Sequence, residues 1–568
     1  MSARISSRYA GNQDYLFSLR QLSRHNLPPP SGLEHELDSM SLELTACDDE
    51  ITRLQAQLTE LEALHRQLTA LRDTAKSLQS PVRRLPTELL VIIFGHVWTE
   101  FTNNGPTDPI SPRLFDLLLL AFAPLLTISQ VCFAWNTIVM NTPGLWTELH
   151  VTCSPWVKNP EAQISATQLL KNGLARSQSL PLCVHIQRQN WGTWEHYRKC
   201  GALSMLCATS NRWKTAVLDC PVNDILDSGV RGHIQCLEIL ELHEDPDAED
   251  ETWGGKTLAS FQDASRLRRV VISEEVAVSL HELPLEQLEE LVYEYDFYED
   301  LVLPLKSLTR LSGSVHFDFG ALRSFRRPSL LPSPDLHLSS NVKTFSVGSN
   351  NEAKEHLGSP AHYSAIIAEL FSSVTLPALT TLRVVFSHYP THAFPWPGTA
   401  FLELAKRSHF DAHLQTLNIR EVLITSAELL SALSVLHNLQ ILIFSDSLII
   451  TTESSSPTET ILTNELLVSL GQTQSVEGTS SHASRLTHTL VPHLHTFSCF
   501  SQLSFDHENF LQFVKSRSSP AEEKPFAVQL SWLPRADGSH PRFERKVESE
   551  LWQLHHQHQI NLSIKQEV

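Results

Sequence analysis

The sequence predicts a multidomain α/β protein with a long N-terminal coiled-coil helix, a short all-α module and an irregular α/β solenoid of short repeats. Three observations predict this fold class. Apolar residues recur every four and three positions within residues 31–80, a proline-led apolar run begins at Leu85, and a leucine-containing phrase recurs between residues 213 and 497. The first pattern is typical of paired helices and the last of stacked strands. A chain of 568 residues is long enough for several domains.

The N-terminal region divides into a tail and a helix. Residues 1–30 are polar, end in three prolines and are expected to form a disordered tail. The heptad spacing that follows predicts a coiled coil over residues 31–80, with one extra three-residue step after Leu61 and an end at Pro81. A parallel homodimer is the favoured partner, although the spacing does not fix the orientation; an intramolecular hairpin or docking against the next module is the alternative. The seam contains Leu33, Leu37, Met40, Leu44, Cys47, Ile51, Leu54, Leu58, Leu61, Leu64, Leu68, Leu71, Ala75 and Leu78.

A short helix with too much apolar surface is predicted next. Pro86 suits the first helical position, and Glu88 in the first turn favours the positive end of the helix dipole. The helix carries two adjacent apolar stripes, and it cannot leave both in water. We therefore expect one stripe to serve the local core and the other to meet a partner. The stripes are formed by Leu89, Ile93 and Val97, and by Leu90 and Phe94.

Two later segments complete a recognisable pattern. The run from Leu85 to Phe94 is followed by Val131-Cys132-Phe133-Ala134-Trp135 and by Asn141-Thr142-Pro143-Gly144-Leu145-Trp146. Together they resemble an F-box over residues 81–150, and they are most similar to the F-box domain-containing proteins of mushroom-forming fungi. An insertion at about residues 97–124 departs from a compact F-box. The resemblance implies adaptor contact through Leu85, Pro86, Leu89, Leu90, Ile93, Val131, Cys132 and Trp135.

Beyond residue 150 the pattern changes from helical to strand-like. Leu149–Val151 and Leu182–Ile186 alternate as strands do, and then an apolar residue, two variable residues and a second apolar residue recur. The phrase resembles an irregular leucine-rich repeat, so residues 151–515 are expected to form a solenoid and residues 516–568 a C-terminal tail or cap. Residues 363–370 and 401–406 should supply helices. The phrases begin at Trp213, Leu237, Leu267, Leu288, Leu308, Val342, Leu379, Leu414, Leu439 and Leu494.

One predicted repeat strand could take part in binding. Strand alternation would project Glu294, Asp296 and Tyr298 to one face, where acidic and aromatic groups could hold a basic segment of a target protein. The alternative is an ordinary strand followed by a solvated acidic loop.

Composition excludes several functional classes. The formal net charge of −19 opposes binding to nucleic acid. The acidic run at residues 244–251 is expected to be a solvated loop, with a site for basic partners as the alternative. Nine cysteines without a CxxC pair indicate a reducing compartment, and residues 1–20 lack the apolar core of a signal peptide. No apolar run is long enough for a membrane span, so we expect a cytoplasmic or nuclear protein without membrane contact.

The sequence also lacks the usual catalytic motifs. We find no GxSxG, GxxxxGK[ST], GxGxxG or HExxH. Histidines cluster at residues 482–495 and 555–558, but no cysteine pair accompanies them, and a solvated polar helix explains the second cluster. We therefore expect no catalytic residue, no cofactor and no bound metal.

These observations favour a receptor that recruits other proteins. The F-box resemblance implies a non-catalytic substrate-recognition subunit of an SCF-type ubiquitin ligase, bound to a Skp-type adaptor and through it to a cullin. The repeats would hold a target protein, whose identity the sequence does not reveal. The alternative is a coiled-coil and repeat scaffold that uses the F-box for assembly without ubiquitin transfer.

Overall fold

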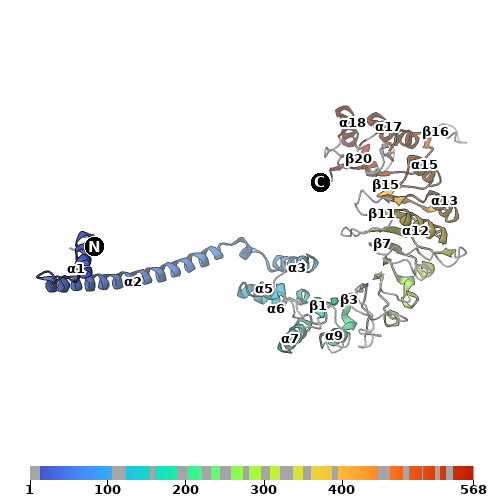
Figure 1. Cartoon of the computed structure of the whole chain (residues 1–568). Coiled ribbons are helices and arrows are strands. Elements are labelled where there is room, and N and C mark those ends of the chain that lie inside the picture. Colours follow the sequence, from blue (N-terminus) through green and yellow to red (C-terminus); the bar gives the residue numbers. More distant parts are fainter. Residues whose placement is uncertain are drawn as a thin grey trace. The chain divides into compact units, whose positions relative to one another are not determined.

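The computed structural model divides into two compact units, Met1–Ile93 and Phe94–Val568 (Figure 1). It describes residues 13–104, 123–153, 160–188, 201–219, 230, 232–243, 258–272, 280–295, 308–319, 337–349, 360–386, 394–445, 461–476, 485–501, 503, 505–518, 525–532 and 542–566. Within these residues the fold is mixed α/β, with a long N-terminal helix and a large, open parallel sheet.

The first unit is helical. It contains α1 (Gln13–Arg24), α2 (Leu33–Leu78), the 3-10 turn η1 (Pro81–Arg84) and the start of α3 (Thr87–Asn104). Helix α1 lies in the segment that we expected to be a tail. Tyr15, Leu19 and Leu22 are spaced by four and three residues, so they share one helix face, and all three are partly buried. The Tyr15 hydroxyl donates a hydrogen bond to Glu36 and links α1 to the first turns of α2.

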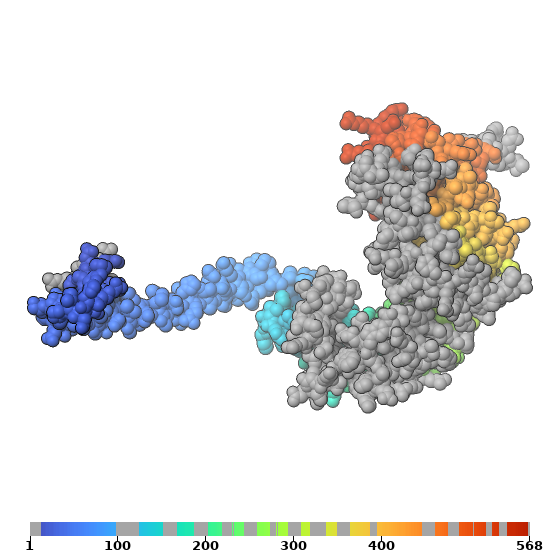
Figure 2. Space-filling view, in the orientation of Figure 1, coloured from blue at the N-terminus to red at the C-terminus, as the bar shows by residue number. Residues whose placement is uncertain are grey.

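Helix α2 follows the predicted heptad segment closely. It is 46 residues long, begins after Gly32 and ends before Gln79, and none of its residues is buried. Figure 2 shows its side chains at the surface along the helix. The predicted long helix is thus confirmed, whereas its pairing with another helix stays a prediction.

The second unit begins with the short helices expected for the module at residues 81–150. These are the remainder of α3, α5 (Ala123–Ser129), α6 (Phe133–Asn141) and the 3-10 turn η2 (Pro143–Trp146). Helix α3 continues to Asn104, inside the predicted insertion, whose residues 105–122 lie outside the described ranges.

A fourteen-stranded sheet forms most of the second unit. Its strand order follows the chain, and each strand is parallel to its neighbours. The strands are β1 (Glu148–Cys153), β2 (Leu182–Arg188), β3 (Trp213–Asp219), β4 (Ile239–His243), β5 (Arg269–Ile272), β6 (Glu290–Tyr295), β7 (Ser314–Phe319), β9 (Thr344–Ser349), β11 (Thr381–Phe386), β13 (Thr416–Arg420), β15 (Ile441–Ser445), β18 (Thr496–Ser501), β19 (Phe526–Trp532) and β20 (Ile560–Gln566).

The described helices and 3-10 turns between the strands lie on one side of the sheet (Figure 1). We call the other side the open face. The α-helices are α7 (Pro160–Arg176), α9 (Gly201–Cys207), α12 (Pro360–Ser373), α13 (Gly398–Arg407), α14 (Phe410–His413), α15 (Ser426–Ser434), α16 (Asn464–Gly471), α17 (His507–Arg517) and α18 (Arg545–His556). The 3-10 turns are η3 (Ser210–Arg212), η4 (Ala259–Phe261), η5 (Leu280–Glu282), η6 (Leu285–Gln287) and η7 (Leu308–Arg310).

Three two-stranded sheets accompany the large one. They pair β8 (Leu338–Ser339) with β10 (Val374–Thr375), β12 (Phe394–Pro395) with β14 (Val422–Leu423), and β16 (Thr473–Val476) with β17 (Arg485–His488). Among the helices of the described ranges, none is both long and apolar enough to cross a membrane.

The recurring phrase explains the register of the sheet. Its second apolar residue stands at the same position on successive strands, so these side chains form one buried row under the sheet. Each row member lies between the equivalent residues of the two neighbouring strands, so the register follows from the phrase. The row is also covered by helices, since Phe497 packs against Phe510 and Phe513 of α17. The row contains Leu149, Val184, Ala216, Leu240, Val270, Leu291, Val315, Phe345, Leu382, Leu417, Leu442, Phe497, Val528 and Leu562.

Two parts of the repeat prediction differ from the structure. The phrase at Leu308–Leu311 forms turn η7, and strand β7 begins only at Ser314, so Val315 takes the place in the buried row that Leu311 would have taken. The sheet also continues past residue 515 through β19 and β20. The phrase is missing from that region, where only alternation indicates the strands, at Phe526, Val528 and Leu530 and at Ile560, Leu562 and Ile564.

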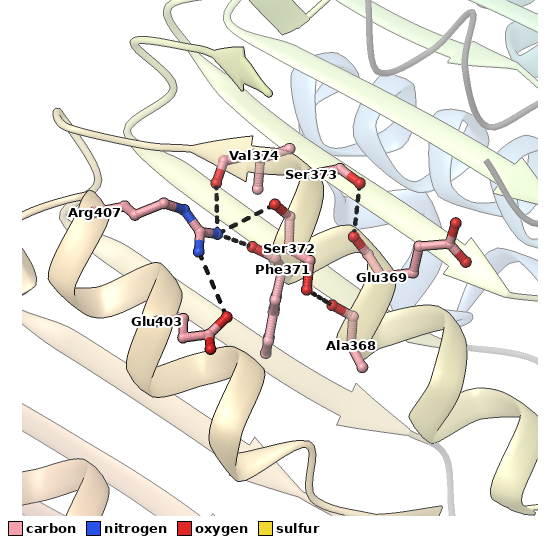
Figure 3. Close-up of polar contacts among 8 residues, drawn as sticks. All are labelled: Ala368, Glu369, Phe371, Ser372, Ser373, Val374, Glu403 and Arg407. Carbon is pink, nitrogen blue, oxygen red and sulfur yellow. Dashed lines mark hydrogen bonds and ion pairs between the residues drawn. The ribbon is translucent and has the colours of Figure 1, made fainter. Parts of the chain in front are cut away.

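Arginine side chains tie the ends of helices to the next helix or turn. Arg407 on α13 donates hydrogen bonds through Nη2 to the carbonyl oxygens of Phe371 (2.5 Å) and Val374 (3.3 Å), where α12 ends (Figure 3). Its Nη1 lies 3.9 Å from Glu403. Because the last carbonyls of a helix have no partner within it, a guanidinium satisfies them and also favours the negative end of the helix dipole.

Candidate protein-interaction surfaces

Helix α3 buries one of its two apolar stripes and exposes the other. Leu90 and Phe94 are 6% and 1% exposed, whereas Leu89 and Ile93 are 46% and 42% exposed, and Val97 is also open. The expectation that only one stripe serves the core is therefore confirmed. Leu90 belongs to the buried stripe, so we leave it out of the surface that could meet a partner.

Leu85 and Pro86, which lie between η1 and α3, differ in their exposure. Leu85 is partly buried, and Pro86 is exposed directly before the first turn of α3. The Pro86 carbonyl accepts a hydrogen bond from the Leu90 amide, which places Pro86 at the start of the helix as the sequence predicted. Ile92, which the sequence analysis did not select, is 55% exposed beside Ile93.

In the second unit, too, the residues predicted to contact the adaptor differ in how far they are buried. Val131 is 60% exposed, and Cys132 precedes α6 and is partly buried. Trp135 is partly buried, and its ring lies 4.9 Å from that of Phe94. Trp135 thus packs in the core of the module as well as reaching its surface.

Phe133 is the residue that the sequence analysis missed. Its side chain is 87% exposed, more than any other large apolar residue in the described ranges. It stands at the first position of α6, where no preceding helical turn covers it. An apolar residue at such a position is the signal that would have identified it.

The Leu145-Trp146 end of the pattern has a structural role. Both side chains are buried, and the Trp146 indole nitrogen donates a 2.7 Å hydrogen bond to the Val139 carbonyl on α6. The Arg176 guanidinium at the end of α7 lies 4.7 Å from the centre of the Trp146 ring. This segment therefore joins the short helices to the beginning of the sheet.

The predicted target-binding residues are only partly described. Glu294 lies on β6, next to the buried Tyr293 and opposite Asp318 of β7. Asp296 and Tyr298 lie outside the described residues. The structure thus places one of the three residues in the sheet and leaves their grouping a prediction.

The open face carries polar and titratable side chains between the buried rows. At one end the rings of His150 and His185 stack 4.1 Å apart, and Glu241 lies 3.8 Å from His243. Farther along, His316 Nε2 lies 3.9 Å from Asp318. Burial and the nearby Arg383 lower the pKa of His316 to about 4, so this approach is not an ion pair at neutral pH.

These histidines predict an acid-sensitive fold. Burial, with a smaller effect of His185, lowers the pKa of His150 to about 4, and burial also lowers the pKa of His185. Because the unfolded chain binds protons near pH 6.5 and the folded chain does not, stability should fall as pH decreases from about 6.5 to 4. We expect a loss of roughly 1–2 kcal/mol each from His150 and His316 at pH 5, after allowing for solvent screening.

Thermal unfolding at pH 7.5, 6 and 5 measures this effect. The double variant His150→Gln with His316→Gln should lose less stability between pH 7.5 and 5 than the natural chain. Equal pH dependence of the two proteins would show that these histidines do not cause it.

No group in the described ranges brings together three histidine, cysteine, aspartate or glutamate side chains in an arrangement that could hold a metal ion. His482 lies outside those ranges, and His555 accepts a 3.1 Å hydrogen bond from the Leu562 amide on β20. No model of a known protein family matches the chain, and no curated protein matches it.

Proposed function

We propose that the chain is the target-recognition subunit of an SCF-type ubiquitin ligase. The module at residues 81–150 binds a Skp-type adaptor, which brings a cullin, and the sheet presents its open face to a target protein. The observation that carries the proposal is the exposed apolar stripe of α3, which continues the F-box-like motif. Such a subunit acts by proximity, since it turns the encounter of target and conjugating enzyme into a local event.

The proposed adaptor contacts are apolar side chains from both halves of the motif that are exposed or only partly buried. Since each is already partly covered, its complete burial gives roughly 1–2 kcal/mol. Burial of several of these side chains together gives a free energy within the range of about 4–15 kcal/mol that association costs. Most of the residues must therefore be buried in the complex for tight binding. The set is Leu85, Pro86, Leu89, Ile92, Ile93, Val131, Cys132, Phe133 and Trp135.

We further propose that the second unit is an irregular leucine-rich-repeat-like solenoid. Its support is the strand order that follows the chain and the buried row that the recurring phrase forms. Each repeat then buries its apolar side chains against neighbouring repeats, and the face opposite the described helices is the candidate surface for a target. Partly exposed acidic groups such as Glu241 suit a target segment that carries basic residues.

A scaffold without ubiquitin transfer is the second candidate. Helix α2 favours it, because a helix of 46 residues without a buried residue can pair with a helix of another chain.

Reconstitution separates the two candidates. The full-length chain is mixed with a purified Skp-type adaptor and a cullin, and the bound proteins are recovered through a tag on the chain. Recovery of adaptor and cullin supports the ligase subunit, and adaptor alone supports the scaffold. Recovery of neither would contradict the assignment of the module.

A further inference from the structure

Helix α2 exposes an apolar seam over its length. Leu37, Leu44, Ile51, Leu54 and Leu58 are exposed, and so are the seam leucines that follow them up to Leu78. Helix α1 lies beside only the first turns, near Glu36. A heptad seam of this length is suited to a second helix that carries the same pattern, and the chain itself supplies that pattern in another copy.

Charge is distributed unevenly along α2. Its first 18 residues, 33–50, carry seven acidic side chains and neither lysine nor arginine: Glu34, Glu36, Asp38, Glu43, Asp48, Asp49 and Glu50. By contrast, residues 65–82 have a net charge of +2, from Arg66, Arg72, Asp73 and Lys76. A parallel pair would place the two acidic segments side by side within a Debye length, whereas an antiparallel pair places each beside the cationic segment.

The seam also has a matching antiparallel register. If Ile51 faces Leu64 of the second copy, the extra three-residue step between Leu61 and Leu64 lies opposite the ordinary three-residue step between Ile51 and Leu54. Six pairs of apolar seam residues then meet, while Leu58 at the centre faces Gln57 of the second copy and Leu33 faces Val82, beyond the end of α2. The pairs are Leu37 with Leu78, Met40 with Ala75, Leu44 with Leu71, Cys47 with Leu68, Ile51 with Leu64, and Leu54 with Leu61.

We propose that α2 forms an antiparallel coiled-coil dimer with α2 of a second copy of the chain. At a rise of 1.5 Å per residue, the two ends of α2 are about 69 Å apart. The dimer therefore sends the segments that follow α2 in the two copies away from opposite ends of the helix pair. This inference is independent of adaptor binding, which takes no part in its test.

The first measurement is the mass of the purified full-length chain in solution by light scattering. We expect twice the mass of the 63.9 kDa chain. The double variant Leu54→Glu with Leu61→Glu should weaken the dimer at least roughly 100-fold, because it buries charges in the seam, and it should leave unfolding of the sheet unchanged. A monomeric natural chain, or a double variant that remains dimeric, would overturn the proposal.

Crosslinking with a short bis-maleimide then fixes the orientation. In a parallel dimer the two Cys47 side chains face each other and become linked. In the antiparallel register they are about 31 Å apart, and Cys47 instead faces residue 68. We expect no link between the two Cys47 side chains in the natural chain. In the variant Leu68→Cys we expect a link between Cys47 of one copy and the introduced cysteine of the other, both results read by peptide mass spectrometry.

Two controls complete the test. The variant Leu68→Cys with Cys47→Ser should lose the link, because two cysteines at position 68 are again far apart in the antiparallel register. Raising the salt concentration should weaken the natural dimer several-fold, since it screens the attraction between acidic and cationic segments. A link between the two Cys47 side chains, or a dimer that tightens with salt, would show that the helices are parallel.

Discussion

Replacing Phe133 with glutamate should abolish capture of a Skp-type adaptor and leave the fold intact. The ring is 87% exposed, so the substitution removes no core packing. In the complex, however, a carboxylate would be buried among apolar side chains without a partner, which costs several kcal/mol. We expect affinity for the purified adaptor to fall at least about 100-fold, as measured by calorimetry, while the melting temperature stays within about 2 °C of the natural value.

A matched control comes from a later helix of the second unit. Val468 on α16 is also an exposed apolar residue, at 49%, and lies far from the motif in the chain. The variant Val468→Glu should therefore bind the adaptor normally. The buried Phe94 gives the converse control, because Phe94→Ala should lower stability and binding together. Adaptor capture by Phe133→Glu at the natural affinity would remove Phe133 from the docking surface.

In the module at residues 81–150, the helix faces could be predicted from the sequence, but the burial of each face could not. Periodicity separated the stripe of Leu89 and Ile93 from that of Leu90 and Phe94, because helix geometry alone decides which residues share a face. It did not decide which stripe is buried, because that depends on helices that arrive later in the chain. For the same reason it treated Leu90 as a contact residue, although Leu90 is buried.

In the sheet, the phrase predicted most of the strands because strand register and burial share a period of two residues. It failed at Leu308–Leu311, because Leu308 begins turn η7, Leu311 directly follows that turn, and Val315 fills the buried row instead. Apolar residues three apart fit a helical turn as well as a strand, so only the neighbouring strands resolve the choice. The arginine contacts with helix ends could not be predicted, since they join residues 26 to 47 positions apart.

Replacing Arg517 with alanine should be among the most destabilising single changes in the second unit. Arg517 is 6% exposed at the end of α17. Its Nη2 donates to the carbonyl oxygen of Leu470 at 2.7 Å and to that of Leu490 at 2.8 Å, and its Nη1 donates to Val491 at 2.8 Å. The side chain thus holds the end of α16 and the loop before β18, where Val491 has a positive φ of 41°.

Loss of this side chain leaves three carbonyl groups without that donor and opens a cavity. Because unsatisfied buried polar groups and cavities both cost free energy, we expect Arg517→Ala to lower the free energy of unfolding by about 3–5 kcal/mol. Arg517→Lys should recover part of it, since an ammonium cannot reproduce the planar fork that reaches all three carbonyls. Urea unfolding followed by tryptophan fluorescence measures both variants.

Two other cations show whether burial of the guanidinium causes the effect. Lys515 lies on the same helix and pairs with Glu550 at 2.6 Å, but it is partly exposed, so Lys515→Ala should cost less than about 1 kcal/mol. Arg407 binds helix-end carbonyls as Arg517 does but is more exposed, so Arg407→Ala should fall between the two. If Arg517→Ala lowered the free energy of unfolding no more than Lys515→Ala, water could replace the contacts of Arg517. The buried guanidinium would then not stabilise the end of α16.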